Sequence, residues 1–156
     1  MPAVYQKLGV HFLYPENWQV LEEESENWPN SLTLQSEQTS FWTLNIYPAA
    51  TELKPVVKEI VDSIKEVYPD LEVIPTQEVI GDALTKGVDI CFFYLDLLVE
   101  ARIRTLRTPS QTLVWHYQAE SREFEKNSLV FKAIAQSMLQ KLVPVPENQA
   151  SAEDKA

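Results

Sequence analysis

The chain has 156 residues, of which 45% are hydrophobic, and it carries a formal net charge of −10. This length favours a single domain whose core needs neither metals nor disulfides. The negative charge repels phosphate backbones and anionic headgroups, so we expect no nucleic-acid binding and no membrane insertion. No apolar run reaches the roughly 18 residues of a spanning helix, and we expect no signal peptide at the N-terminal segment.

The only cysteine, Cys91, cannot form an internal disulfide. Nothing therefore requires an oxidising compartment, and we expect a cytoplasmic location. Cys91 lies in the apolar run from Ile90 to Tyr94, which predicts a small buried side chain rather than a reactive thiol.

The first third of the chain alternates apolar and polar residues, which is typical of strands. Pro15 ends the first segment, Glu22–Glu26 is expected as a solvated acidic loop, and Glu37–Ser40 as a turn. The predicted strands are 10–14, 18–21, 31–36 and 41–47.

A change of period then predicts a helix over about 52–68. Thr51 is the expected N-cap, Pro55 falls in the first turns, and Pro69 follows the end. The apolar positions recur at spacings of three and four: Leu53, Val56, Val57, Ile60, Val61, Ile64, Val67 and Tyr68.

Four further strands and a closing helix follow. We place the strands at about 71–80, 87–95, 98–107 and 111–120, with a break at Asp96–Leu97. The helix begins within 122–128 and runs to about Leu142. This order predicts an α+β domain over 1–143 with a mainly antiparallel sheet flanked by helices, and a flexible C-terminal tail over 144–156.

Motifs for chemistry are lacking. Three glycines permit neither a P-loop nor a dinucleotide fingerprint. Two histidines and one cysteine offer no zinc pattern, and no nucleophile-elbow motif occurs. We therefore expect no cofactor, no metal and no catalytic residue.

The tryptophans have a simpler interpretation than ligand stacking. Trp42 and Trp115 fall on the apolar phase of their strands and are expected in the core. Trp28 lies in a predicted loop, where burial and exposure are equally compatible with the sequence.

One polar cluster is a candidate surface. A three-residue turn at Pro109–Gln111 would place Arg104 opposite His116 and Arg102 opposite Gln118. The predicted patch consists of Glu100, Arg102, Arg104, His116, Gln118 and Glu120. It is either a binding surface or a solvated face with cross-strand pairs; in both cases exchanging the two arginines for Gln would leave the fold intact.

The segment Leu8-Gly-Val-His-Phe-Leu-Tyr-Pro-Glu-Asn-Trp18, followed by this order of elements over about 8–142, resembles the PsbP/Mog-like superfamily. Pro15 stops the strand, and Trp18 can fold back as a large buried anchor. The resemblance implies the PsbP/Mog-like α/β/α-type sandwich and a binding protein; members include a photosystem II subunit, a Ran-interacting protein and DcrB-like effector chaperones.

The sequence therefore predicts a non-enzymatic binding or adaptor domain that acts through contacts with another protein. The first alternative is a small-ligand binder or enzyme that uses the polar sheet face around Arg102, Arg104 and His116. A DcrB-like secretion-effector chaperone is a further alternative within the binding class. The partner and the choice between monomer and homodimer stay open.

Overall fold

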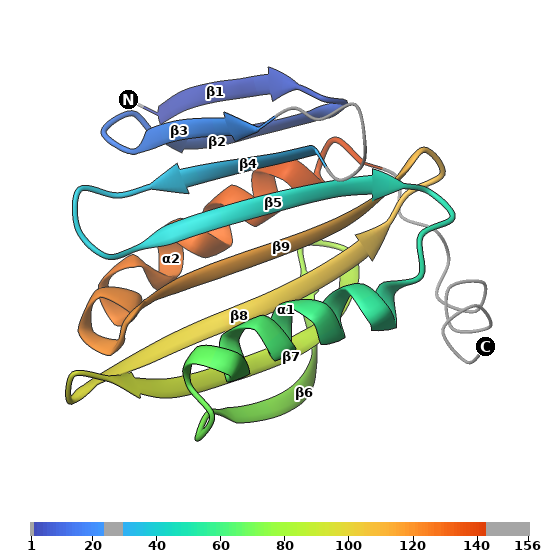
Figure 1. Cartoon of the computed structure of the whole chain (residues 1–156). Coiled ribbons are helices and arrows are strands. Elements are labelled where there is room, and N and C mark those ends of the chain that lie inside the picture. Colours follow the sequence, from blue (N-terminus) through green and yellow to red (C-terminus); the bar gives the residue numbers. More distant parts are fainter. Residues whose placement is uncertain (1, 24–29, 143–156) are drawn as a thin grey trace.

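The computed structural model describes residues 2–23 and 30–142. These residues form two helices and nine strands: β1 (Pro2–Lys7), β2 (Val10–Pro15), β3 (Gln19–Glu23), β4 (Asn30–Gln35), β5 (Phe41–Pro48), α1 (Leu53–Val67), β6 (Glu72–Ile80), β7 (Ala83–Tyr94), β8 (Leu97–Arg107), β9 (Gln111–Glu120) and α2 (Ser121–Leu139). Seven strands form one antiparallel sheet in the order β3-β4-β5-β9-β8-β7-β6, and β1 and β2 form a separate hairpin (Figure 1).

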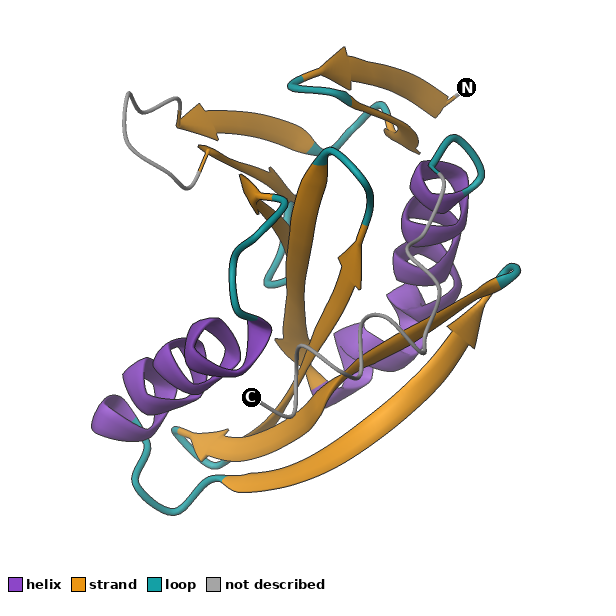
Figure 2. Cartoon of the chain, turned by 90° about the vertical axis from the view of Figure 1, so that its right-hand side faces the viewer, coloured by secondary structure: helices purple, strands orange, loops and turns teal. Residues whose placement is uncertain are grey.

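The two helices cover opposite faces of the sheet (Figure 2). The hairpin β1–β2 packs with α2 on one face, and α1 lies on the other. This arrangement confirms the predicted α+β class with a mainly antiparallel sheet flanked by helices. No helix among residues 2–23 and 30–142 is long and apolar enough to cross a membrane.

The larger core lies between the sheet and α2. Trp42 and Trp115 are fully buried there, as predicted from the phase of their strands. Phe12 of the hairpin packs against Trp42 with 5.3 Å between ring centroids. Trp18 is also buried and meets Phe131 of α2 edge to face, so the expected role of this anchor is confirmed.

The other face carries a thinner core. Ile90, Ala101, Ile103 and Val114 are buried on it, but no residue of α1 is itself buried. The N-cap of α1 is Glu52, with no side-chain cap hydrogen bond, so the expected Thr51 cap is wrong. The Thr51 carbonyl instead accepts a hydrogen bond of 2.6 Å from Arg107 at the end of β8.

Several element boundaries differ from those predicted. β1 was not expected, because only Tyr5 of its side chains is buried and the alternation signal is weak. β7 begins at Ala83 instead of about 87, and α2 ends at Leu139.

Cys91 is only partly buried, because it points away from the buried neighbours Ile90 and Phe92. The tail 144–156, Trp28 and most of the acidic loop lie outside the described residues.

The register of the last hairpin also differs from the prediction. Arg107 pairs with Thr112, so the β8–β9 loop holds two residues, Pro109 and Ser110. Thr108 N donates to the Gln111 carbonyl at 2.8 Å, and Gln111 N donates to Thr108 Oγ1 at 3.0 Å. The predicted three-residue turn is therefore wrong by one residue, which reverses the face on which every β9 side chain lies relative to β8.

Candidate functional site

The shifted register divides the predicted polar patch between the two faces of the sheet. Arg104 lies opposite Trp115 rather than His116, and Arg102 opposite Tyr117 rather than Gln118. The structure therefore brings together Glu100, Arg102 and Arg104 on the α2 side, and it separates them from His116 and Gln118 on the α1 side. The six residues do not form one surface.

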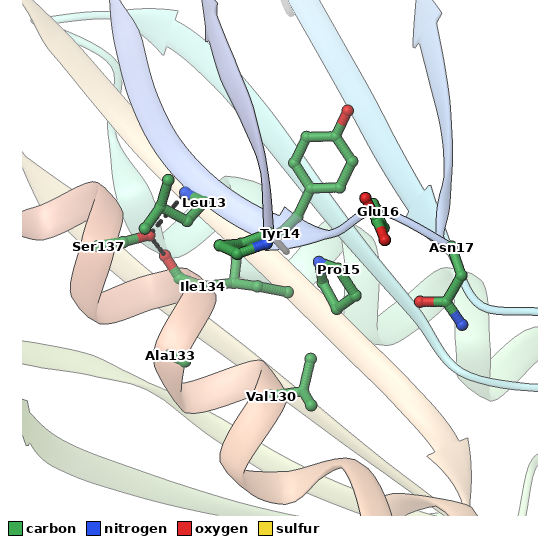
Figure 3. Close-up of a pocket in the computed structure, with 10 residues that line it drawn as sticks. Leu13, Tyr14, Pro15, Glu16, Asn17, Val130, Ala133, Ile134 and Ser137 are labelled. Carbon is green, nitrogen blue, oxygen red and sulfur yellow. Dashed lines mark hydrogen bonds between the residues drawn. The ribbon is translucent and has the colours of Figure 1, made fainter.

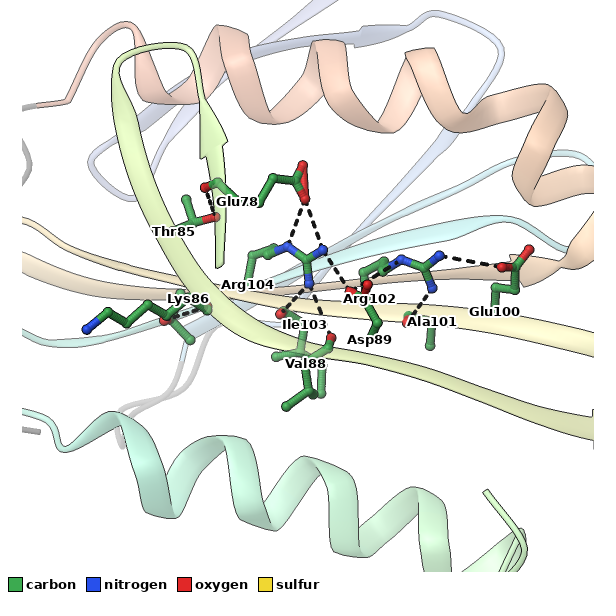
Figure 4. Close-up of polar contacts among 11 residues, drawn as sticks. Glu78, Thr85, Lys86, Val88, Asp89, Glu100, Ala101, Arg102, Ile103 and Arg104 are labelled. Atoms are coloured by element: carbon green, nitrogen blue, oxygen red, sulfur yellow. Dashed lines mark hydrogen bonds and ion pairs between the residues drawn. The ribbon is translucent and has the colours of Figure 1, made fainter. Parts of the chain in front are cut away.

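Arg104 is the centre of a buried ion-pair network (Figure 4). Its Nη2 lies 2.9 Å from Glu78 Oε2 and 2.8 Å from Asp89 Oδ1. Its Nη1 donates to the carbonyls of Val88 and Ile103 at 3.2 and 3.1 Å. With a side chain that is only 4% exposed, Arg104 is not part of an open binding face, which corrects the prediction.

Arg102 lies beside this network, nearer the solvent. Its guanidinium is 3.4 Å from carboxylate oxygens of Asp89 and of Glu100. The same group lies over the Phe124 ring of α2, 4.6 Å from the centroid. Asp89 therefore joins the two arginines, and Phe124 of α2 covers Arg102.

The electrostatics follow from this geometry. Burial alone would lower the pKa of Arg104, but the Coulombic interaction with the neighbouring Tyr117 hydroxyl, the charge and hydrogen bond of Asp89 and the hydrogen bond of Glu78 raise it above its usual value. Burial raises the pKa of Tyr117 to about 12, so its hydroxyl stays protonated. The network thus holds a permanent cation and two carboxylates, which is typical of a structural ion-pair cluster rather than of an acid–base pair.

The other three predicted residues have different surroundings. Burial lowers the pKa of His116 to about 4, and its Nε2 is buried without a hydrogen-bond partner in the described part of the chain. The Phe41 ring meets the imidazole edge to face at 5.4 Å. Gln118 lies opposite Ala101, and Glu120 is the N-cap of α2, where its side chain accepts from Glu123 N. A binding role for the six residues stays a prediction.

A recess lies where the opening motif meets α2 (Figure 3). Leu13 N donates to Ser137 Oγ at 2.9 Å, and this hydroxyl donates to the Ile134 carbonyl at 2.9 Å. The recess has a volume of about 530 Å³ and is lined by Pro2, Leu13, Tyr14, Pro15, Glu16, Asn17, Val130, Ala133, Ile134 and Ser137. Its mostly apolar lining can accept a side chain, but it carries no convergent polar set for chemistry.

The β7–β8 hairpin ends in an exposed apolar tip that the sequence analysis did not identify. Phe93, Tyr94, Leu95 and Leu97 expose 70%, 50%, 77% and 41% of their surfaces. Tyr94 pairs with Leu97, so the turn consists of Leu95 and Asp96 alone, with φ angles of 50° and 65°. The signal that the sequence offered was a predicted break without Gly or Asn, with apolar residues that continue up to Leu95, the first residue of the turn.

No metal centre is apparent in the part of the chain that the structure describes. There, no group of three or more His, Cys, Asp or Glu side chains could hold a metal ion.

Comparisons with known proteins identify the fold. No family model and no curated protein sequence matches the chain. The solution structure of the cyanobacterial PsbP protein CyanoP from Synechocystis sp. PCC 6803 matches with a TM-score of 0.60 and 12% identity, over 87% of this chain and 90% of that chain. The Ran-binding protein Mog1p from Saccharomyces cerevisiae matches with a TM-score of 0.55 and 10% identity, over 95% and 97%. A mutant of Mog1 matches with a TM-score of 0.51 and 10% identity, over 96% of this chain and 99% of that chain.

The chain therefore has the PsbP/Mog-like fold that its opening motif implied. At these identities the likeness concerns the fold alone, and one fold serves many functions. What this chain binds must be argued from its own surface.

Proposed function

We propose that this protein is a non-enzymatic binding or adaptor domain, and that the β7–β8 hairpin tip is its contact surface for another protein. The observation that carries the proposal is a bulky, 77% exposed leucine in a left-handed backbone conformation at Leu95. This conformation disfavours residues other than Gly, Asn and Asp by roughly 1–2 kcal/mol. A turn residue chosen for folding alone would be Asn or Gly.

The surroundings of the tip support a large, specific contact. Tyr68, just after α1, stacks on Phe92 with 4.2 Å between centroids and meets Tyr94 edge to face. The base of the tip is therefore held rigidly, while Phe93, Leu95 and Leu97 remain exposed. Rigid aromatic and aliphatic anchors on a polar background are typical of protein-interface hot spots.

Charge favours a protein partner over a lipid surface. Asp96 lies in the turn itself, and Glu72 and Glu100 flank Cys91 on either side of β7. These carboxylates add to a net charge of −10, which disfavours approach to anionic membranes. The expected partner has an apolar recess bordered by basic side chains. That Mog1p is named a Ran-binding protein is compatible with protein binding on this fold.

Site-specific photocrosslinking tests the proposal. A benzoylphenylalanine at position 93 is compared with one at Leu129, an exposed apolar residue of α2 that is 78% exposed. We expect a discrete crosslinked protein from position 93 alone. That protein, once purified, should bind the wild-type chain and the Leu129→Asn variant equally, and the Leu95→Asn variant at least about tenfold more weakly, as loss of a hot spot implies.

Three outcomes would contradict the proposal. The purified candidate could bind the Leu95→Asn variant as tightly as wild type. The two crosslinker positions could capture the same proteins. Uncharged phosphatidylcholine vesicles could bind the wild-type chain and not Leu95→Asn, which would make the tip a membrane contact instead.

A further inference from the structure

A groove between α1 and the sheet differs in charge from the rest of the molecule. It has a volume of about 620 Å³ and is lined by Leu53, Lys54, Val57, Lys58, Val61, Pro75, Lys86, Gly87, Val88 and Thr105. Three of these residues are lysines and none is acidic, although the whole chain has 23 acidic and 13 basic residues. The groove is therefore a positive site on a negative protein.

Two of the lysines have no acidic partner within the described part of the chain. Lys58 Nζ lies 2.6 Å from Asp62 Oδ2, but Lys54 and Lys86 form no comparable ion pair among those residues. Lys54 and Lys86 approach the groove from α1 and β7, respectively. Positive charge therefore lines the groove from both walls, which favours an anionic group there.

The N-terminal end of α1 adds to the positive potential of the groove. The helix has no acidic residue in its first turn and no side-chain N-cap, and Lys54 stands in that turn. A cation there is opposed by the helix dipole, and Lys54 and Lys58 repel each other at a spacing of four. Glu52, the N-cap residue, and Asp62, which pairs with Lys58, offset part of this repulsion, and an anion at the groove would relieve the rest.

The walls and floor of the groove fit hydrocarbon rather than a polar molecule. Val57 and Val61 of α1 face Pro75 and Val88 of the sheet. The one hydroxyl of the lining, on Thr105, already donates to the Lys86 carbonyl at 2.9 Å. Since no residue of α1 is buried, the apolar stripe of this helix still has surface to cover. Figure 4 shows α1 standing below the strands that carry Val88 and Ile103.

We propose that this groove binds a small amphiphilic anion, an acyl chain with one carboxylate or phosphate head group. The chain would lie between α1 and strands β6–β8, with its head at Lys54 and Lys86. The volume falls within the roughly 300–1,000 Å³ of small-ligand sites and is small for a folded peptide segment. This ligand is independent of the protein partner proposed for the hairpin tip.

Calorimetric titration with sodium oleate below its critical micelle concentration tests this inference, with amide NMR spectra of the same samples. We expect saturable one-to-one binding, with shifts at Lys54, Val57, Val61 and Val88. Oleyl alcohol lacks the charge and should bind at least about tenfold more weakly, because a hydrogen bond to a charged group contributes on the order of a factor of ten. Acetate keeps the charge but lacks the chain, and it should also bind at least about tenfold more weakly because it buries almost no apolar surface. A parallel titration with oleoyl lysophosphatidate compares the affinity for a phosphate head group with the affinity for the carboxylate of oleate.

The double variant Lys54→Gln/Lys86→Gln should lose oleate affinity at least about tenfold, while its unfolding transition stays unchanged or rises slightly because the unfavourable charge of Lys54 is removed. Lys132→Gln on α2 is the matched control and should bind as wild type. Absence of saturable binding, equal binding of oleate and oleyl alcohol, or shifts confined to the recess at Tyr14–Asn17 would each overturn the proposal. Shifts of the groove residues with protein concentration alone, without oleate binding, would instead make the groove a self-association surface.

Discussion

Arg104 and Asp89 form an ion pair of 2.8 Å across neighbouring strands, although they are not register partners. Arg104 lies opposite Gly87, and Asp89 lies opposite Arg102. Because Gly87 has no side chain, the guanidinium can reach diagonally to Asp89 and also to Glu78 on β6. One arginine thereby links β8, β7 and the edge strand β6 of the sheet.

This network predicts a large difference between the two arginines. Arg104→Gln should lower the free energy of unfolding by about 3 kcal/mol, since it removes the ion pair of Glu78 and leaves Asp89 with only its longer contact to Arg102. Arg102→Gln should cost about 1 kcal/mol or less, because its pairs are longer and nearer the solvent. Urea unfolding of both variants at neutral pH measures the difference. Equal and small losses would restore the open face that the sequence suggested.

Burial of His116 predicts a specific dependence of stability on pH. Its pKa is about 4 in the folded protein against an ordinary value of 6.5, so between these values only the unfolded state takes up the proton. The free energy of unfolding should therefore fall as the pH drops from 6.5 toward 4, by no more than about 3–4 kcal/mol from this residue, and stay level above 6.5.

The carboxylates also titrate at low pH, so the informative quantity is the difference between wild type and His116→Gln. That difference should shrink or reverse as the pH falls, because the variant has no imidazole to protonate on unfolding. An NMR titration of the His116 ring gives the pKa directly. A ring that titrates near 6.5 would show that the imidazole is solvated and would remove the basis of this prediction.

The fold could be predicted because each sequence pattern that indicates a strand or a helix repeats over many residues. The alternation in 31–36 and 41–47 and the three–four spacing in 53–68 each involve many residues, so single exceptions do not change the interpretation. β1 was missed because only Tyr5 of that strand is buried, which gives little alternation to detect.

The candidate site was not predictable, because it depended on one turn. A loop of three residues and a loop of two at Pro109–Ser110 differ by one step, and that step exchanges the faces of β9. Thr108 closes the shorter loop by accepting from Gln111 N through its side chain, and composition does not reveal this contact. The burial of Arg104 depends likewise on Glu78, which is distant in the sequence.

Trp115 should be among the most sensitive core positions. It is fully buried, and its Nε1 has no hydrogen-bond partner within the described residues. Trp115→Ala should lower the free energy of unfolding by about 3–5 kcal/mol, whereas Trp115→Phe should lose less because it also removes the unsatisfied N–H. Denaturant unfolding compares the two. A loss under about 1 kcal/mol for Ala would be incompatible with the burial described here.

Gly87 and Gly81 offer a matched pair of substitutions. A Cβ at Gly87 would lie 1.7 Å from the Ile103 carbonyl oxygen, so β7 and β8 would have to separate. Gly87→Ala should therefore destabilise by about 3 kcal/mol or more. At Gly81 the φ angle is +62° and no atom lies within 4 Å, so Gly81→Ala should cost only about 1 kcal/mol of backbone strain. Thermal unfolding of the two variants should rank them in this order, and the reverse order would contradict the close strand approach.

The last prediction separates folding from binding at the hairpin tip. Leu95 has a φ of 50° and is 77% exposed, so its side chain adds backbone strain without burial in the free protein. Asn tolerates this conformation, and Asn at the first position of a two-residue turn is favoured in hairpins. Leu95→Asn should therefore raise the free energy of unfolding by about 1 kcal/mol while it weakens partner binding.

Leu129→Asn, at a helical position of similar exposure, should not gain stability. Urea unfolding of both variants checks this. A variant Leu95→Asn that is less stable than wild type would mean that Leu95 packs within the protein, and the strained turn would then need no partner to explain it.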